Sequence, residues 1–140
     1  MSALTVLTPR EASMFACLCD TVVAPAGELP GVAQTDAAFA FDQMLAASPP
    51  LNRLGLRALI VALELAPLTL GARRRLRRLD AQQRTDALAR LARTNAGAGM
   101  LEIARGIAYF SYYGDDTVMR RLGYDADAVV ARAREVRACR

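Results

Sequence analysis

The residue types best suited to chemistry lie together in one stretch, residues 108–116, which reads AYFSYYGDD. It holds four of the eight aromatic residues of the chain, and a glycine and two carboxylates follow the rings at once. Paired carboxylates can act as general acid and base, and rings beside acids can line a ligand pocket. The same residues can also belong to the core or to a surface that contacts another protein.

Catalytic partners for the two carboxylates, Asp115 and Asp116, are missing from the sequence. The 140 residues include no histidine, no nucleophile motif and no glycine-rich loop that follows a strand. Turns and helix starts use aspartate routinely, so these two residues are predicted to end one helix and begin the next. We therefore expect no catalytic and no cofactor-binding residue in this chain.

The three cysteines, Cys17, Cys19 and Cys139, do not suggest a metal site or a disulfide framework. Their number is odd, and two positions that are two residues apart on a helix point to different sides. Without histidine, zinc and haem lose their commonest protein ligand. We expect the thiols to be buried as small apolar side chains and to bind no metal.

The positive charge of the chain is concentrated in residues 73–78, RRRLRR. All 18 basic residues are arginine, and the formal net charge is +4. Outside this segment, thirteen arginines against fourteen acids leave −1, and no aromatic residue is interleaved with the run. We predict that this segment is a solvated face of a helix or linker. An acidic patch on a partner protein and nucleic acid are the two alternative ligands, and of these nucleic acid is not expected.

Composition favours a single domain over residues 1–140, with disordered ends at residues 1–7 and 138–140. Hydrophobic residues make up 54% of the chain and aromatic residues only 6%, so the core is expected to consist mostly of aliphatic side chains. No apolar run approaches the roughly 18 residues that span a bilayer. The first residues lack the pattern of a signal peptide, so a cytoplasmic protein without membrane insertion is expected, or a periplasmic one if a partner carries it there.

Apolar residues recur at helical spacing almost throughout. Thr8, Pro9 and Glu11 form a capping box, and Asp80 with Gln83 forms a second one. Helix breaks are predicted at Pro25 and Gly27, at 48–50, at Pro67 and Gly71, at Asn95 and Gly97, at Gly114 and at Gly123. The pattern predicts an all-α fold, a single-domain orthogonal bundle of about five to six helices.

The predicted fifth helix, about 98–113, is apolar on nearly every side, with Glu102 and Arg105 as its only charges. Such a helix is either buried on several sides or faces a partner. Tyrosine and arginine are the residues that protein interfaces favour, and they cluster just here. We predict a partner interface of Tyr109, Tyr112, Tyr113, Asp115, Arg120, Arg121 and Tyr124.

Several motifs in order resemble those of a known family. The chain closes with YYGD (112–115), VMRR (118–121) and LGYD (122–125), and it opens with LTPRE (7–11) and DTVVAP (20–25). Leu79 and Asp80, with QQR (82–84), resemble a further helix start between them. Over about residues 4–126, the sequence resembles the gluconate 2-dehydrogenase subunit 3 family.

The resemblance implies a small, helical, non-catalytic subunit of a flavin-dependent sugar, alcohol or steroid dehydrogenase. The large partner, a GMC-type oxidoreductase, would hold FAD and the active site, and this chain would stabilise, mature or escort it. Two other functions stay open: a standalone binding protein or enzyme with a pocket under the tyrosines, and an arginine-rich regulatory or nucleic-acid-binding protein.

Overall fold

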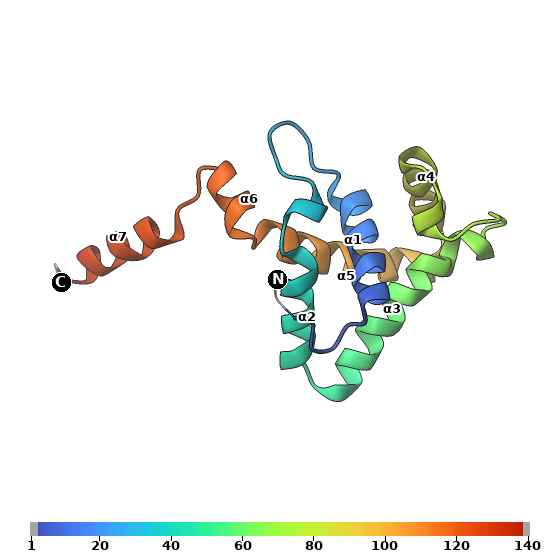
Figure 1. Ribbon diagram of the computed structural model, residues 1–140, viewed down its shortest axis with the longest axis horizontal. Helices are drawn as coiled ribbons and strands as arrows, with labels where there is room; N and C mark the ends of the chain where they lie inside the picture. Colours follow the sequence, from blue (N-terminus) through green and yellow to red (C-terminus); the bar gives the residue numbers. More distant parts are fainter. Residues whose placement is uncertain (1–2, 139–140) are drawn as a thin grey trace.

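The computed structural model describes residues 3–138, and within them every regular element is a helix. The predicted all-α bundle is confirmed, and α1 to α6 form one packed body from which α7 extends (Figure 1). Residues 1–2 and 139–140, for which disorder is expected, lie outside the described residues, and so does Cys139. The helices are α1 Pro9–Val23, α2 Ala37–Ala47, α3 Pro50–Thr69, α4 Ala81–Leu91, α5 Asn95–Tyr113, α6 Asp116–Arg121 and α7 Ala126–Ala138, with short 3-10 turns η1 Val32–Gln34 and η2 Leu76–Arg78.

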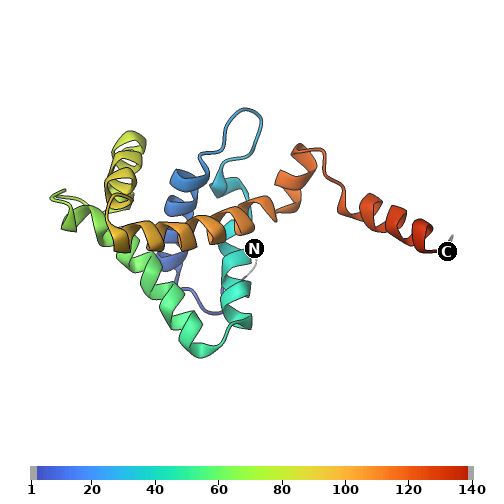
Figure 2. The same cartoon turned by 180° about the vertical axis from the view of Figure 1, so that it is seen from behind.

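Helix α1 occupies the centre of the body and contacts α2, α3, α4 and α5. Its buried stripe consists of Met14, Phe15, Leu18 and Cys19. Phe15 stacks on Phe41 of α2 with ring centroids 4.3 Å apart. Helix α5 runs across α1 and α2 on the far side of the body (Figure 2). Burial of this aliphatic and aromatic core is the main term that stabilises the bundle.

A buried carboxylate fastens the start of the chain to α2. Asp42 is fully buried, and its Oδ2 accepts hydrogen bonds from the amide and the hydroxyl of Thr5, each at 2.8 Å. Its Oδ1 accepts from the amides of Val6 at 2.9 Å and Leu7 at 2.7 Å. A disordered end is predicted for residues 1–7, but Thr5, Val6 and Leu7 are held in place by these hydrogen bonds, which we call the Asp42 clamp.

Both predicted capping boxes are confirmed. Thr8 Oγ1 accepts from the amide of Glu11, and Glu11 Oε2 accepts from the amide of Thr8. Glu11 also pairs with Arg57 of α3, with 2.9 Å between Oε1 and Nε, so the first turn of α1 is tied to α3. Asp80 and Gln83 exchange the equivalent bonds at the start of α4.

Two of the predicted helix breaks are wrong. Pro67 lies inside α3, which continues to Thr69. Only Leu68 and Thr69 follow it in α3, so the missing hydrogen-bond donor and the proline ring interrupt the helix just before its end. Asn95 and Gly97 begin α5 instead of ending α4, because Thr94 is the N-cap and its Oγ1 accepts from the amide of Gly97 at 3.0 Å.

The C-cap of α1 offers a stabilising substitution. Ala24 has φ +46° and ψ +63°, a left-handed conformation that its Cβ disfavours. Ala24→Gly is therefore expected to raise the free energy of unfolding by about 0.5–1 kcal/mol. Urea unfolding followed by circular dichroism measures the change. Ala26→Gly, also in an exposed position but without positive φ, is the control, and an equal gain for both would contradict the assignment.

Candidate partner interface

The predicted interface residues lie on the C-terminal half of α5, on α6 and in the turn before α7. These segments form the end of the body from which α7 extends (Figure 1). Tyr109, Tyr113 and Tyr124 are 44%, 40% and 49% exposed, and Arg120 and Arg121 are exposed as well. The fold thus brings five of the seven predicted residues to the surface at one end of the molecule.

Tyr112 is not part of that surface. Its side chain is fully buried, and its hydroxyl donates a 2.6 Å hydrogen bond to the carbonyl of Pro30. Burial, with the neighbouring Tyr113 as a lesser cause, raises the pKa of Tyr112. The prediction that Tyr112 contacts a partner is wrong, because the 25–31 loop supplies the acceptor that lets a phenol enter the core.

Asp115 uses both carboxylate oxygens within the chain. Its Oδ1 accepts from the amides of Thr117 at 2.8 Å and Val118 at 3.3 Å, so Asp115 is the N-cap of α6. Its Oδ2 accepts from the amide of Asp36 at the start of α2, at 2.9 Å. Asp115 therefore positions α6 against the body, and its role as a partner contact stays a prediction.

The exposed part of α5 is larger and more apolar than predicted. Tyr109 and Tyr113 lie with ring centroids 6.0 Å apart. Phe110 is 67% exposed and Ile103 is also exposed. We call the exposed set Ile103, Tyr109, Phe110 and Tyr113 the α5 face. Its i, i+7 pair of Ile103 and Phe110 was visible in the sequence, but periodicity alone does not say which face is covered.

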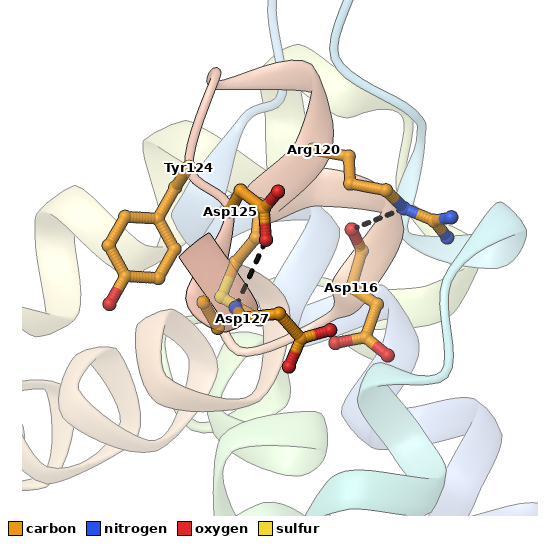
Figure 3. Close-up of a pocket in the computed structure, with 7 residues that line it drawn as sticks. Asp116, Arg120, Tyr124, Asp125 and Asp127 are labelled. Carbon is orange, nitrogen blue, oxygen red and sulfur yellow. Dashed lines mark hydrogen bonds between the residues drawn. The ribbon is translucent and has the colours of Figure 1, made fainter. Parts of the chain in front are cut away.

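A small open hollow of about 300 Å³ lies beside Tyr124, between α6 and the start of α7 (Figure 3). Asp125 Oδ1 accepts from the amide of Asp127, and Arg120 Nε donates to the backbone carbonyl of Asp116. The ring of Tyr124 points away from the carboxylates of Asp116 and Asp127 (Figure 3). The hollow therefore offers a ligand two exposed carboxylates and one guanidinium, with Asp125 already serving as a helix cap.

The thiols within the described residues are those of Cys17 and Cys19. Cys19 is fully buried, and its Sγ donates to the carbonyl of Ala108 at 3.7 Å. Burial raises the pKa of Cys19 to about 12, which suppresses the thiolate at neutral pH. Cys17 is half-buried, and both thiols are free. Residues 3–138 bring no three side chains of histidine, cysteine, aspartate or glutamate together as a metal-binding group.

In the described part of the chain, no helix combines the length and apolar character that crossing a bilayer requires. Comparison with known proteins adds no assignment, since no family model, no curated protein and no solved structure matches this chain. The family resemblance consequently rests on the sequence motifs themselves, and the function drawn from it is a proposal.

Proposed function

We propose that this protein is a non-catalytic accessory subunit of a FAD-dependent GMC-type oxidoreductase. The catalytic subunit would hold FAD and act on a sugar, alcohol or steroid. This chain would bind that subunit through the α5 face and the exposed residues of α6 and the turn that follows, and stabilise it or help it mature. The identity of the partner comes from the sequence resemblance, and the binding role is supported by the surface of the molecule.

The observation that carries the proposal is the state of α7. This helix has 13 residues and none of them is buried. Val129, Ala133 and Val136 lie on one stripe of α7, and both valines are about half exposed or more. An isolated helix of this length is marginal in water, so packing against another surface would stabilise it.

The aromatic residues at the same end support a protein partner. The C-terminal half of α5, α6 and the turn after it carry large exposed apolar side chains together with the exposed Arg120 and Arg121: Tyr109, Phe110, Tyr113, Leu122 and Tyr124. Apolar side chains grouped in this way, with arginine nearby, are typical of surfaces that bind proteins. A protein partner would cover the rings while their polar edges and the guanidinium groups keep hydrogen-bonding partners.

Tyr113→Ala and Arg121→Ala are each expected to weaken the complex by about 1–2 kcal/mol, because each removes an exposed group of the type that dominates interfaces. The measurement is co-expression with the GMC-type oxidoreductase encoded nearest in the genome. Affinity capture and the FAD content of the captured catalytic chain are then quantified. Arg93→Ala is the matched control, since Arg93 is exposed at the junction of α4 and α5.

Failure to co-purify, together with an unchanged FAD content of the catalytic chain, would contradict the proposal. Equal weakening by Arg93→Ala would show that the chosen surface is wrong while leaving the partnership intact. The cytoplasmic location stays a prediction, and fractionation of the producing cells together with the partner tests it.

A further inference from the structure

A second surface, at the other end of the molecule, concentrates positive charge around a hollow. The loop between α3 and α4 lies opposite the end from which α7 extends (Figure 1). Together with the first turn of α1, it encloses an open hollow of about 710 Å³. We call this the arginine hollow, and its basic residues are Arg10, Arg73, Arg74, Arg75, Arg77 and Arg78.

The loop that carries these residues is anchored from below. Glu64 of α3 also lines the hollow, is only 2% exposed, and accepts from Arg77 Nε at 2.9 Å and from the Arg77 amide at 3.3 Å. Leu76, in the same turn, is buried in the core. Arg84 of α4 donates to the carbonyl of Leu76 at 3.3 Å. These contacts fix the backbone that positions the neighbouring arginines.

The charge of the hollow is not neutralised within the described residues. Only Arg77 among the six has a carboxylate partner there, Glu64. The other five arginines all line the hollow, and none of them forms an ion pair with residues 3–138: Arg10, Arg73, Arg74, Arg75 and Arg78. Like charges held together repel, and a multivalent anion that binds among them removes that repulsion.

We propose that the arginine hollow binds a small oligophosphate, the chemistry shared by free polyphosphate and by the di- and triphosphate groups of nucleotides. The planar guanidinium group donates two parallel hydrogen bonds to phosphate oxygens, and six arginines line this hollow. The residues that line the hollow include no aromatic side chain on which a base could stack. The site therefore recognises phosphate and not the nucleobase.

The surroundings favour a compact anion over a nucleic-acid backbone. Neighbouring arginines are already used within the chain: Arg57 pairs with Glu11, and Arg90 donates to the carbonyl of Leu70 at 2.9 Å. Arg57 and Arg90 do not line the hollow, so the arginines that do line it form a compact cluster and not a long track of phosphate contacts. The hollow is also separate from the α5 face, so the proposal does not depend on the accessory-subunit function.

The test is calorimetric titration of the purified chain with sodium tripolyphosphate in dilute buffer. We expect one site, with orthophosphate binding at least about tenfold more weakly because it engages fewer guanidinium groups. Arg73→Gln/Arg74→Gln/Arg75→Gln is expected to weaken tripolyphosphate by about tenfold or more. The control Arg132→Gln/Arg134→Gln/Arg137→Gln removes the same formal charge from α7 and should change affinity less than about twofold. Thermal unfolding verifies that both variants are folded.

Further titrations separate the possible ligands. ATP that binds within about threefold of tripolyphosphate supports recognition of phosphate alone, whereas a preference for ATP above about tenfold overturns it. The proposal is also overturned if tripolyphosphate shows no saturable binding at about 1 mM, or if both triple variants lose affinity equally. Tighter binding of a poly-glutamate peptide or of duplex DNA than of tripolyphosphate would overturn it in favour of an acidic protein or nucleic acid.

Discussion

Asp42→Asn is expected to lower the free energy of unfolding by about 3 kcal/mol, the largest loss among the polar substitutions considered. The Asp42 carboxylate is fully buried and accepts four hydrogen bonds from Thr5, Val6 and Leu7. An asparagine places an NH₂ group against some of these donors and removes the charge that strengthens the remaining bonds. The amides of residues 5–7 then lose their partners, and the segment detaches from α2.

The same clamp predicts how stability depends on pH. Burial by itself raises the pKa of Asp42, but the hydrogen bonds from Leu7, Thr5 and Val6 outweigh it and lower the pKa to about 2, from an ordinary value of 3.8. The folded state thus favours the ionised form more strongly than the unfolded state does. The ionised Asp42 carboxylate therefore adds about 2 kcal/mol to the free energy of unfolding. This contribution is complete above about pH 4 and is lost as the pH falls through about 2.

Urea unfolding of the wild type and Asp42→Asn over this acidic range measures both effects. The difference between the two proteins should shrink as pH falls, because protonation removes the wild-type advantage. Asp86→Asn, a change of the same kind at an exposed position of α4, should alter stability by less than about 0.5 kcal/mol. A difference between wild type and Asp42→Asn that stays constant with pH would contradict the role of the ionised carboxylate.

Gly97→Ala is expected to lower the free energy of unfolding by about 2 kcal/mol, although alanine is the better helix former. Gly97 lies in the first turn of α5 and is buried. A Cβ at this position would overlap with the backbone oxygen of Leu91 and lie 2.7 Å from the Cγ of Leu91. The end of α4 would have to move away from α5, because backbone atoms cannot change rotamer.

Gly99→Ala provides the control in the same helix. A Cβ on Gly99 meets nothing within 4 Å, so the substitution should raise stability by about 0.5–1 kcal/mol through helix propensity alone. Thermal and urea unfolding of both variants would show changes of opposite sign. A gain in stability for Gly97→Ala would show that α4 and α5 are not in close contact at this position.

The parts of the fold that sequence predicted well are those that depend on neighbours within one turn. The capping boxes at Thr8 and Asp80 involve a residue and its third successor, so their geometry is local. Gly97 was misinterpreted because its role depends on the approach of α4, and glycine in isolation is a typical helix end. Pro67 was misinterpreted because proline is a typical helix breaker, whereas α3 continues for two residues beyond it before it ends at Thr69.

The residues that sequence missed are polar groups whose partners lie far along the chain. Asp42 binds residues 35 to 37 positions away, and no spacing rule connects them. Tyr112 was assigned to an interface because tyrosine and arginine cluster around it, whereas the acceptor that allows its hydroxyl to be buried, the carbonyl of Pro30, is 82 residues away. Glu64 and Arg77 pair across the break between α3 and η2. Such pairs become visible only when the chain is folded.

The central position of α1 implies an uneven response to hydrogen exchange. Its amides are covered by four other helices, so they should exchange with solvent deuterium only when the whole bundle opens, and they report the global stability. The amides of α7, where every described side chain is exposed, should exchange within the dead time of the measurement. If a complex slows the exchange of the α7 amides and leaves the exchange rates of the α1 amides unchanged, a bound protein has ordered α7 without any change in the core.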